Sequence, residues 1–132
     1  MAQGKILIID DEEEVREVLA LHLKKGGFET VEAKDGAEAI QLMKKGSNLV
    51  NVGLIICDIR MPKINGVEAI DFLRQNAASI PILVVTGYPD TELAVSLIGK
   101  GVKDYLVKPV SKEKLLKTVS RFFSEEQAFQ YA

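Results

Sequence analysis

Cysteine, histidine and long apolar runs are scarce or missing in this chain of 132 residues. The single cysteine, Cys57, excludes an internal disulfide and a cysteine-based metal site. The single histidine leaves no second imidazole for a histidine metal site. No run reaches the ~18 apolar residues that a membrane-spanning helix needs. A disulfide scaffold, a thiolate metal centre and a transmembrane protein are therefore not expected.

An excess of positive charge and a nucleotide-binding glycine motif are missing as well. The chain has 17 basic and 19 acidic residues, for a formal net charge of −2. Nonspecific binding of nucleic acid needs a basic face, so we expect no direct contact with nucleic acid. Neither a G-x-G-x-x-G motif nor a P-loop occurs. The first residues lead directly into an apolar run and do not form a signal peptide, so the expected location is the cytoplasm.

Four short apolar runs are present, and each ends on a polar residue. The runs are Ile6–Ile9, Leu54–Cys57, Ile82–Val85 and Tyr105–Val107, and they precede Asp10-Asp11, Asp58, Thr86 and Lys108-Pro109. Such continuous apolar runs are typical of strands buried on both faces of a parallel sheet. The carboxyl ends of parallel strands lie along one edge, where open α/β sheets bind ligands. We therefore expect three carboxylates, a hydroxyl and an ammonium group in one crevice.

Helical patterns follow the strands along the whole chain, which predicts a single α/β domain. A second, more polar strand is expected at residues 28–33 and a fifth at residues 103–107. The expected inward residues are Val15, Val18, Leu19 and Leu23, then Ala37, Ile40 and Met43, then Val67, Ile70 and Leu73, and finally Leu115, Leu116, Val119, Phe122 and Phe123. Asp90 and Ser111 are the expected N-caps of the last two helices.

Five strand–helix repeats with right-handed crossovers predict a doubly wound, three-layer sandwich. We expect residues 1–124 to form the domain and residues 125–132 to be a continuation of the last helix or a tail.

The carboxylates of Asp10, Asp11 and Asp58 predict a cation site. Three neighbouring carboxylates repel each other, so either their pKa values rise or a cation neutralises them. All candidate ligands are oxygens, and Mg²⁺ (or Mn²⁺) suits a site with few carboxylates and a phosphate oxygen. A second interpretation, compatible with the first, makes Asp10-Asp11 a helix N-cap, with Glu12–Glu14 interacting favourably with the helix dipole.

Asp58, Thr86 and Lys108 together suggest phosphoryl transfer. That reaction needs an in-line nucleophile, a metal ion and fixed positive charge around the phosphoryl oxygens. The carboxylate of Asp58 could be the nucleophile and would form an acyl phosphate. The Thr86 hydroxyl and the Lys108 ammonium could each bind a phosphoryl oxygen.

On these motifs the chain closely resembles the receiver domain of two-component response regulators of the chemotaxis-regulator-like kind, over residues 5–123. The matching motifs are Asp10-Asp11, Asp58 with Met61-Pro62 and Asn65-Gly66 after it, Thr86-Gly87 and Lys108-Pro109. The resemblance implies a flavodoxin-like sheet in the order 2-1-3-4-5 and a cis peptide bond before Pro109. It further implies that Asp58 accepts a phosphoryl group from a histidine kinase or phosphotransfer protein.

The resemblance also implies how the metal is held. Asp11 and Asp58 would bind Mg²⁺ directly, Asp10 would act largely through water, and the backbone carbonyl of Arg60 would be a further ligand. Gly66 and Pro109 would have structural roles at the site.

A conformational switch is part of the same resemblance. Phosphorylation would draw Thr86 toward the new phosphoryl group, and Tyr105 would turn inward. The surface that changes would be the helix starting at Pro89-Asp90, the strand 103–107 and the helix after Ser111. A receiver promotes its own phosphorylation and slow dephosphorylation, so it is not expected to be an enzyme.

Arg60 and Tyr88 occupy the two positions that flank the path of the hydrolytic water in receivers. Both side chains are large, and neither is a carboxylate or an amide. We therefore predict a longer-lived phospho-Asp58 than in a receiver with small polar residues at these positions.

Three alternatives remain open. A haloacid-dehalogenase-like, Mg²⁺-dependent phosphatase would need an acid two positions after Asp58, where Arg60 stands, and a cap insertion that is missing. A flavodoxin-like carrier would need a phosphate loop where the chain has five consecutive acidic residues. The chain is either a free-standing regulator, which we expect, or a piece of a longer regulator or hybrid kinase. Its output would correspondingly pass to a protein partner or to an attached output domain.

Overall fold

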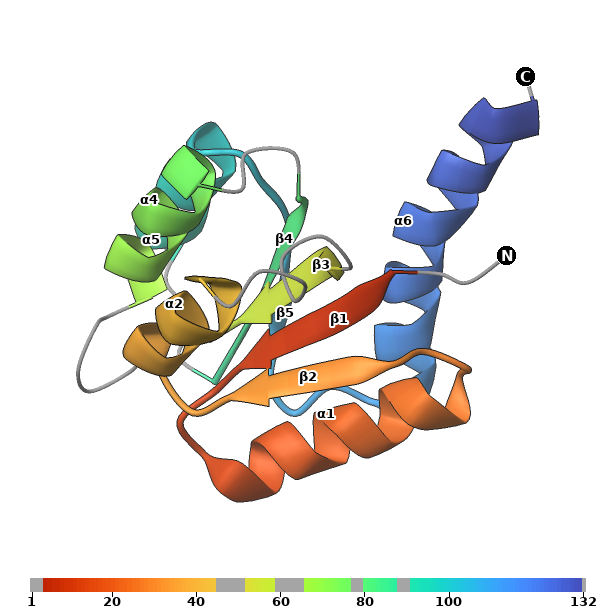
Figure 1. Ribbon diagram of the computed structural model, residues 1–132, viewed down its shortest axis with the longest axis horizontal. Coiled ribbons are helices and arrows are strands. Elements are labelled where there is room, and N and C mark those ends of the chain that lie inside the picture. The colour runs from red at the N-terminus through yellow and green to blue at the C-terminus, as the bar shows by residue number, and fades with distance from the viewer. Residues whose placement is uncertain (1–3, 45–51, 59–65, 77–79, 88–90, 132) are drawn as a thin grey trace.

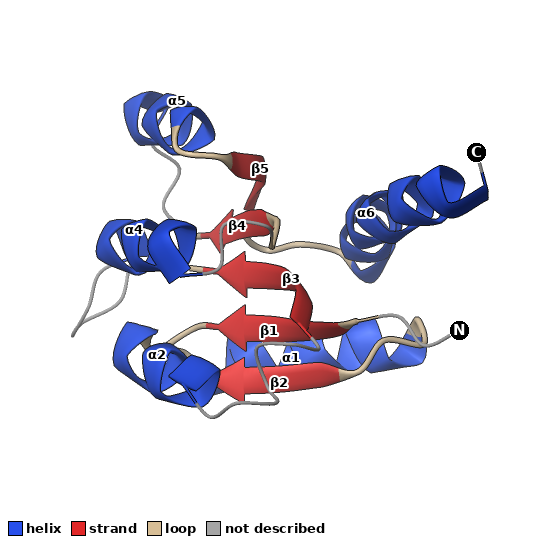
Figure 2. Ribbon diagram, turned by 45° about the horizontal axis from the view of Figure 1, so that its top comes forward, coloured by secondary structure: helices blue, strands red, loops and turns tan. Residues whose placement is uncertain are grey.

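The computed structural model describes residues 4–44, 52–58, 66–76, 80–87 and 91–131. Its strands are β1 (Lys5–Ile9), β2 (Thr30–Ala33), β3 (Val52–Cys57), β4 (Ile82–Thr86) and β5 (Val102–Val107). They form one five-stranded parallel sheet in the order β2-β1-β3-β4-β5 (Figure 2). The predicted flavodoxin-like strand order is thereby confirmed.

The helices complete a three-layer sandwich around this sheet. They are α1 (Glu13–Lys25), α2 (Gly36–Lys44), α4 (Gly66–Asn76), α5 (Thr91–Gly99) and α6 (Lys112–Tyr131). Helices α2, α4 and α5 cover one face of the sheet, and α1 and α6 cover the other (Figure 1). Among the helices in the described part of the chain, none is long and apolar enough to cross a membrane.

Each buried strand supplies side chains to both layers. In β1, Leu7 and Ile9 belong to the core under α2, α4 and α5, whereas Ile6 and Ile8 belong to the core under α1 and α6. The same alternation continues in β3 and β4, whose apolar residues are almost completely buried. Burying each such side chain contributes about 1.5–3 kcal/mol. The apolar runs are continuous because both faces of these strands need apolar residues.

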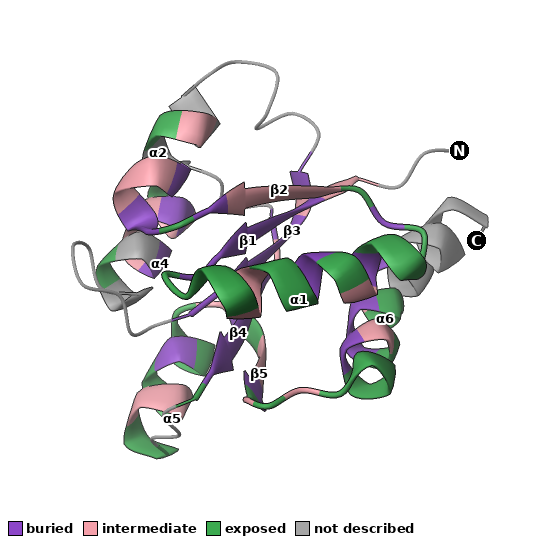
Figure 3. Cartoon of the chain, turned by 90° about the horizontal axis from the view of Figure 1, so that it is seen from below, coloured by how far each residue is buried: buried purple, intermediate pink, exposed green. Residues whose placement is uncertain are grey.

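Most of the predicted inward residues lie in the core, with exceptions in α1 and α2. The buried ones are Leu19, Leu23, Ile70, Leu73, Leu115, Val119 and Phe123, and Val15, Leu116 and Phe122 pack partly buried against them. The prediction for Val18 is wrong, since its side chain is 49% exposed. Val18 lines an open groove together with Pro109. Much of α1 is exposed (Figure 3). In α2, Ala39 is buried and Ala37 only half-buried. The side chains of Ile40, Met43 and Val67 lie outside the described set.

The second strand is shorter than predicted, because α1 ends in a turn that includes Phe28. Gly27 has a φ of +90°, in the left-handed region that favours glycine. The Phe28 amide then donates to the carbonyl of Leu23 at 3.0 Å, so Phe28 closes the helix and does not pair in the sheet. Its buried ring lies 5.3 Å from the ring of Phe123, which joins this turn to α6. The strand at the opposite edge, β5, begins one residue earlier than predicted.

The last helix begins as predicted. The Ser111 hydroxyl accepts a hydrogen bond from the Lys114 amide at 3.1 Å, the geometry of an N-cap. Helix α6 continues to Tyr131, so residues 125–131 prolong the helix. The division of the chain at residue 124 stays a prediction. Asp90, the other predicted cap, lies outside the described residues.

Candidate functional site

Backbone hydrogen bonds between neighbouring strands continue at the polar residues that follow the strands. The Asp10 amide donates to the carbonyl of Ala33 at 3.1 Å, and the Asp58 amide donates to the carbonyl of Ile9 at 2.9 Å. On the other side, the Lys108 amide donates to the carbonyl of Thr86 at 2.8 Å. The parallel ladder therefore continues beyond the apolar runs and sets these polar side chains along one edge, as the sequence predicted.

Lys108 makes a close double contact at this edge. Its Nζ lies 2.7 Å from Asp10 Oδ2 and 2.9 Å from Asp58 Oδ2, and 3.8 Å from Glu12 Oε1. The side chains of Lys108, Asp10 and Asp58 are 13%, 2% and 3% exposed. One ammonium group thus bridges two buried carboxylates that come from different strands.

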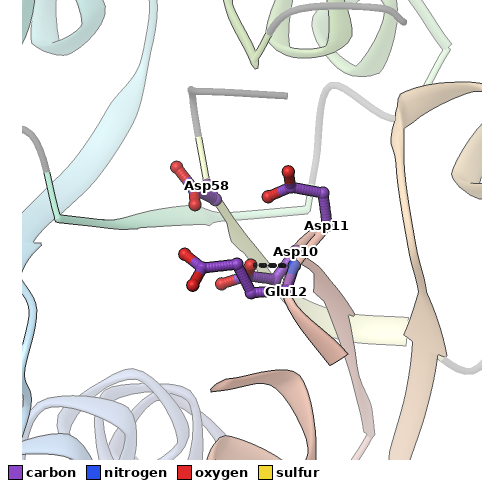
Figure 4. A group of neighbouring side chains, drawn as sticks. All are labelled: Asp10, Asp11, Glu12 and Asp58. Atoms are coloured by element: carbon purple, nitrogen blue, oxygen red, sulfur yellow. Dashed lines mark hydrogen bonds between the residues drawn. The ribbon is translucent and has the colours of Figure 1, made fainter. Parts of the chain in front are cut away.

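Four carboxylates converge beside this ammonium (Figure 4). Asp10, Asp11 and Glu12 follow β1 and Asp58 follows β3, and each offers an oxygen such that all of these oxygens lie within 4.8 Å of one another. Asp10 and Asp58 are buried, while Asp11 and Glu12 are exposed. An all-oxygen ligand set with an open side fits a hard divalent cation such as Mg²⁺.

The buried charges change two pKa values. Burial raises the pKa of Asp10, and the neighbouring charge of Asp58 adds to this, although Lys108 and the Glu12 amide oppose it. Burial alone would lower the pKa of Lys108, but its hydrogen bonds to Asp10 and Asp58 outweigh that effect and the pKa is raised. The ammonium form of Lys108 is therefore held firmly, whereas Asp10 carries a negative charge at a cost in desolvation.

The interpretation of Asp10-Asp11 as a helix N-cap is wrong. Asp10 Oδ1 accepts a hydrogen bond from the Glu12 amide at 2.9 Å, an Asx-type turn that lies before the helix. Glu12 occupies the N-cap position of α1 and makes no capping bond with its side chain. Asp10 cannot reach further into the helix because its other oxygen is bound to Lys108. The expected acidic first turn is present, with Glu13 and Glu14.

Two further predicted residues lie on β4 and β5: Thr86 is the last residue of β4, and Tyr105 lies within β5. Thr86 is fully buried. Tyr105 is half-buried and packs against the core on the side of α2, α4 and α5. The peptide bond between Lys108 and Pro109 is cis, as the resemblance implied. Cys57 lies just under Asp58 and is completely buried, and burial raises the pKa of its thiol. A completely buried thiol with a raised pKa is typical of an unreactive structural cysteine.

Several predicted positions lie outside the described residues. They are Arg60 and Tyr88, with the motif residues Met61-Pro62 and Asn65. Gly66 is the first residue of α4.

The sequence reasoning missed two residues. Glu12 belongs to the carboxylate cluster, although the sequence suggested only an interaction with the helix dipole. Arg16 was not considered, yet its Nη1 donates to the carbonyl of Asp10 at 2.8 Å. Its position one helical turn after Glu12 is a signal that could have placed it next to the acidic segment.

The strand order and the acidic cluster define a doubly wound α/β protein whose ligand crevice lies at the carboxyl ends of the central strands. The chain belongs to the response regulator receiver domain family, whose family model matches residues 6–120. This family acts as a signalling switch in two-component systems, and receiver domains bind Mg²⁺ at such an acidic pocket.

Known proteins of similar sequence and structure support this family membership. The regulatory protein AtoC of Escherichia coli is 33% identical over 120 residues, which cover 91% of this chain and 25% of AtoC. A response regulator receiver protein from Pseudomonas putida superposes with a TM-score of 0.83 at 36% identity, covering 92% of this chain and 98% of that one. The Vibrio cholerae chemotaxis protein CheY4 has a TM-score of 0.82 at 32% identity, covering 92% and 99%. The chain thus spans about a quarter of the length of AtoC.

Proposed function

We propose that this chain is a phosphorylation-controlled switch in which Asp58 accepts the phosphoryl group. The observation that carries the proposal is the position of Lys108, whose ammonium contacts the buried carboxylates of Asp10 and Asp58 at once. An ammonium held beside a carboxylate nucleophile is suited to bind an oxygen of an incoming phosphoryl group.

In the proposed step, a carboxylate oxygen of Asp58 attacks the phosphorus of the donor. An O–P bond forms as the P–N bond of a donor phosphohistidine breaks, and the electron pair of that bond stays on the imidazole. Lys108 stabilises the charge on the transferred oxygens. The buried Thr86 hydroxyl, at the end of the adjacent strand, then donates to one of them. A histidine kinase or a phosphotransfer protein would be the donor.

Asp10, Asp11 and Asp58 would hold Mg²⁺ or Mn²⁺, with the backbone carbonyl of Arg60 as the further ligand. The ion would supply positive charge to phosphoryl oxygens that Lys108 does not reach. Both oxygens of Asp10 already accept hydrogen bonds, from Glu12 and from Lys108. This supports a contribution of Asp10 through water, with direct ligation by Asp11 and Asp58.

The signal would leave through α5, β5 and α6. Tyr105 would connect the site to this surface. It lies on β5, which pairs with β4, and it packs against the same core as Leu97 of α5. The surface also has exposed apolar side chains at Val95, Ile98 and Val107. An apolar surface of this kind suits a protein partner or an attached output domain. We propose a cytoplasmic location for this relay.

The test is incubation with acetyl phosphate and Mg²⁺, followed by intact mass measurement. We expect a gain of one phosphoryl group in the wild type and none in Asp58→Asn, since the amide is not a nucleophile. A matched control is Asp71→Asn, which removes an exposed carboxylate on helix α4, outside the acidic cluster. A phosphoryl group on Asp58→Asn, or none on the wild type with any donor, would overturn the proposal.

The lifetime of the phosphorylated state remains a separate prediction. Arg60 and Tyr88 should slow the approach of water, so radiolabel should be lost faster from the Arg60→Asn/Tyr88→Ala variant than from the wild type. Equal or faster loss from the wild type contradicts this prediction.

A further inference from the structure

Arg16, on the first turns of α1, joins three elements at the edge of the site. Its Nη1 donates to the backbone carbonyl of Asp10 at 2.8 Å, and its Nε donates to Glu32 Oε1 at 3.2 Å. Glu32 lies on β2, and Asp10 directly follows β1. The Arg16 side chain is only 14% exposed, so these bonds are largely shielded from water. The fork of the guanidinium therefore holds the end of β1 against α1 and β2.

The bond to the Asp10 carbonyl bears on the neighbouring residue, Asp11. A peptide group is planar, so a bond that orients the Asp10 carbonyl also orients the direction in which the chain enters Asp11. The Asp11 carboxylate is exposed, and among the described residues no hydrogen bond holds it. The Asp11 side chain points toward Asp58 (Figure 4). Its direction is consequently set by the backbone, and the Arg16 side chain restrains that backbone through its bond to the Asp10 carbonyl.

The other groups of Asp10 are held as well. Its amide binds the Ala33 carbonyl, Oδ1 accepts from the Glu12 amide and Oδ2 accepts from Lys108. These bonds restrain the amide and the side chain of Asp10. The bond from Arg16 restrains the Asp10 carbonyl, which is part of the peptide group between Asp10 and Asp11.

We infer that Arg16 is a positioning residue for divalent-cation binding, acting by orienting the Asp10–Asp11 peptide and leaving the cation itself to the carboxylates. The inference rests on the proposed function, because it concerns the same acidic site. Loss of a residue that orients metal ligands typically costs about 10- to 100-fold in metal affinity.

The test compares variants by their affinity for Mn²⁺, measured from the free ion by electron paramagnetic resonance. Arg16→Gln should bind Mn²⁺ at least ~10-fold more weakly than the wild type. Arg16→Lys should stay close to Arg16→Gln, because an ammonium lacks the planar fork that directs separate N–H groups at the Asp10 carbonyl and at Glu32. Glu32→Gln keeps the bond to the Asp10 carbonyl and should retain most of the affinity. Lys100→Gln removes an equal charge from the exposed ion pair with Asp71 and should bind like the wild type.

Two further measurements separate positioning from stability and from the proposed function. The free energy of unfolding, measured in urea without metal, should fall in both Arg16→Gln and Glu32→Gln, since both break the same ion pair, and fall further in Arg16→Gln, which also loses the bond to the Asp10 carbonyl. Hydrogen exchange at the Glu12 amide, also without metal, should be faster in Arg16→Gln only. Wild-type affinity in Arg16→Gln, full rescue by Arg16→Lys, or unchanged exchange at Glu12 would overturn the inference. A wild type that binds no Mn²⁺ would refute the proposed function, and the exchange result would still decide whether Arg16 orders this segment.

Discussion

Two lysine–aspartate pairs, one at the carboxyl ends of the strands and one on the surface between α4 and the turn after α5, have nearly the same Nζ–Oδ distance. Lys108, which follows β5, has its Nζ 2.7 Å from Asp10 Oδ2. Lys100, which precedes β5, has its Nζ 2.8 Å from Asp71 Oδ1. The exposures of the paired side chains differ: 13% and 2% in the first pair, 38% and 48% in the second. Water screens the exposed pair, which is worth about 0–1 kcal/mol. The extent of burial, and not the distance, therefore distinguishes the pair at the acidic site from an ordinary surface contact.

The largest expected effect comes from removing the buried ammonium. Without divalent ions, Lys108→Met should lower the free energy of unfolding by about 3 kcal/mol, because two buried carboxylates lose their counter-charge. Added Mg²⁺ should then stabilise the variant more than the wild type, since the ion takes over that neutralisation. Urea unfolding in EDTA and in Mg²⁺ measures both effects. An equal loss in Lys100→Met would remove the distinction between the two pairs.

A smaller effect of opposite sign is expected from Asp10→Asn. The pKa of Asp10 is raised by burial, so its ionisation costs stability in the folded protein. Asp10→Asn should therefore stabilise the protein at pH 7 by about 1 kcal/mol, while weakening metal binding. The gain should vanish below the ordinary pKa of 3.8, where Asp10 is protonated in both states, grow as pH rises from there to the raised folded value, and stay constant above it.

Thermal unfolding from pH 3 to pH 8 would measure this difference. A gain that is constant across that range would mean that the charge of Asp10 is not its source. Asp71→Asn, at the exposed pair, is the matched control and should show no comparable pH dependence.

The smallest effect belongs to the exposed pair itself. Lys100→Met should change the free energy of unfolding by no more than ~0.5 kcal/mol, and 1 M salt should remove most of that difference. Urea unfolding at low and high salt is the measurement. A salt-resistant loss of the size expected for Lys108→Met would show that the exposed pair is as important as the buried one.

Much of the fold could be read from the residue pattern. The apolar runs of β1, β3 and β4 are confirmed as strands buried on both faces, and the inward side chains of Leu19, Ile70 and Leu115 are confirmed as core residues. These predictions succeed because burial on both faces demands apolar residues at every position, and a helix demands them at a period near 3.6. The strand order came from the family resemblance, since local patterns do not identify strand neighbours.

The errors occur where a contact distant in sequence decides the outcome. Phe28 fits a strand by its local pattern, but its ring packs on Phe123 and its amide closes α1. Val18 fits the inner face of α1, but the residues after β5 leave a groove beside it. Asp10 fits a helix cap, but Lys108, 98 positions later in the chain, binds its second oxygen.

The sequence by itself determined the class of fold, the polar ends of the strands and therefore which residues would share one edge. Strand ends meet because parallel strands in a doubly wound sheet all point the same way. Only the tertiary structure decided that Lys108 bridges Asp10 and Asp58 and that Glu12 joins their cluster. The same holds for the hydrogen bond that Arg16 donates to the Asp10 carbonyl. Those contacts depend on ångström-scale approach between separate elements, and on burial from water, neither of which is encoded in local spacing.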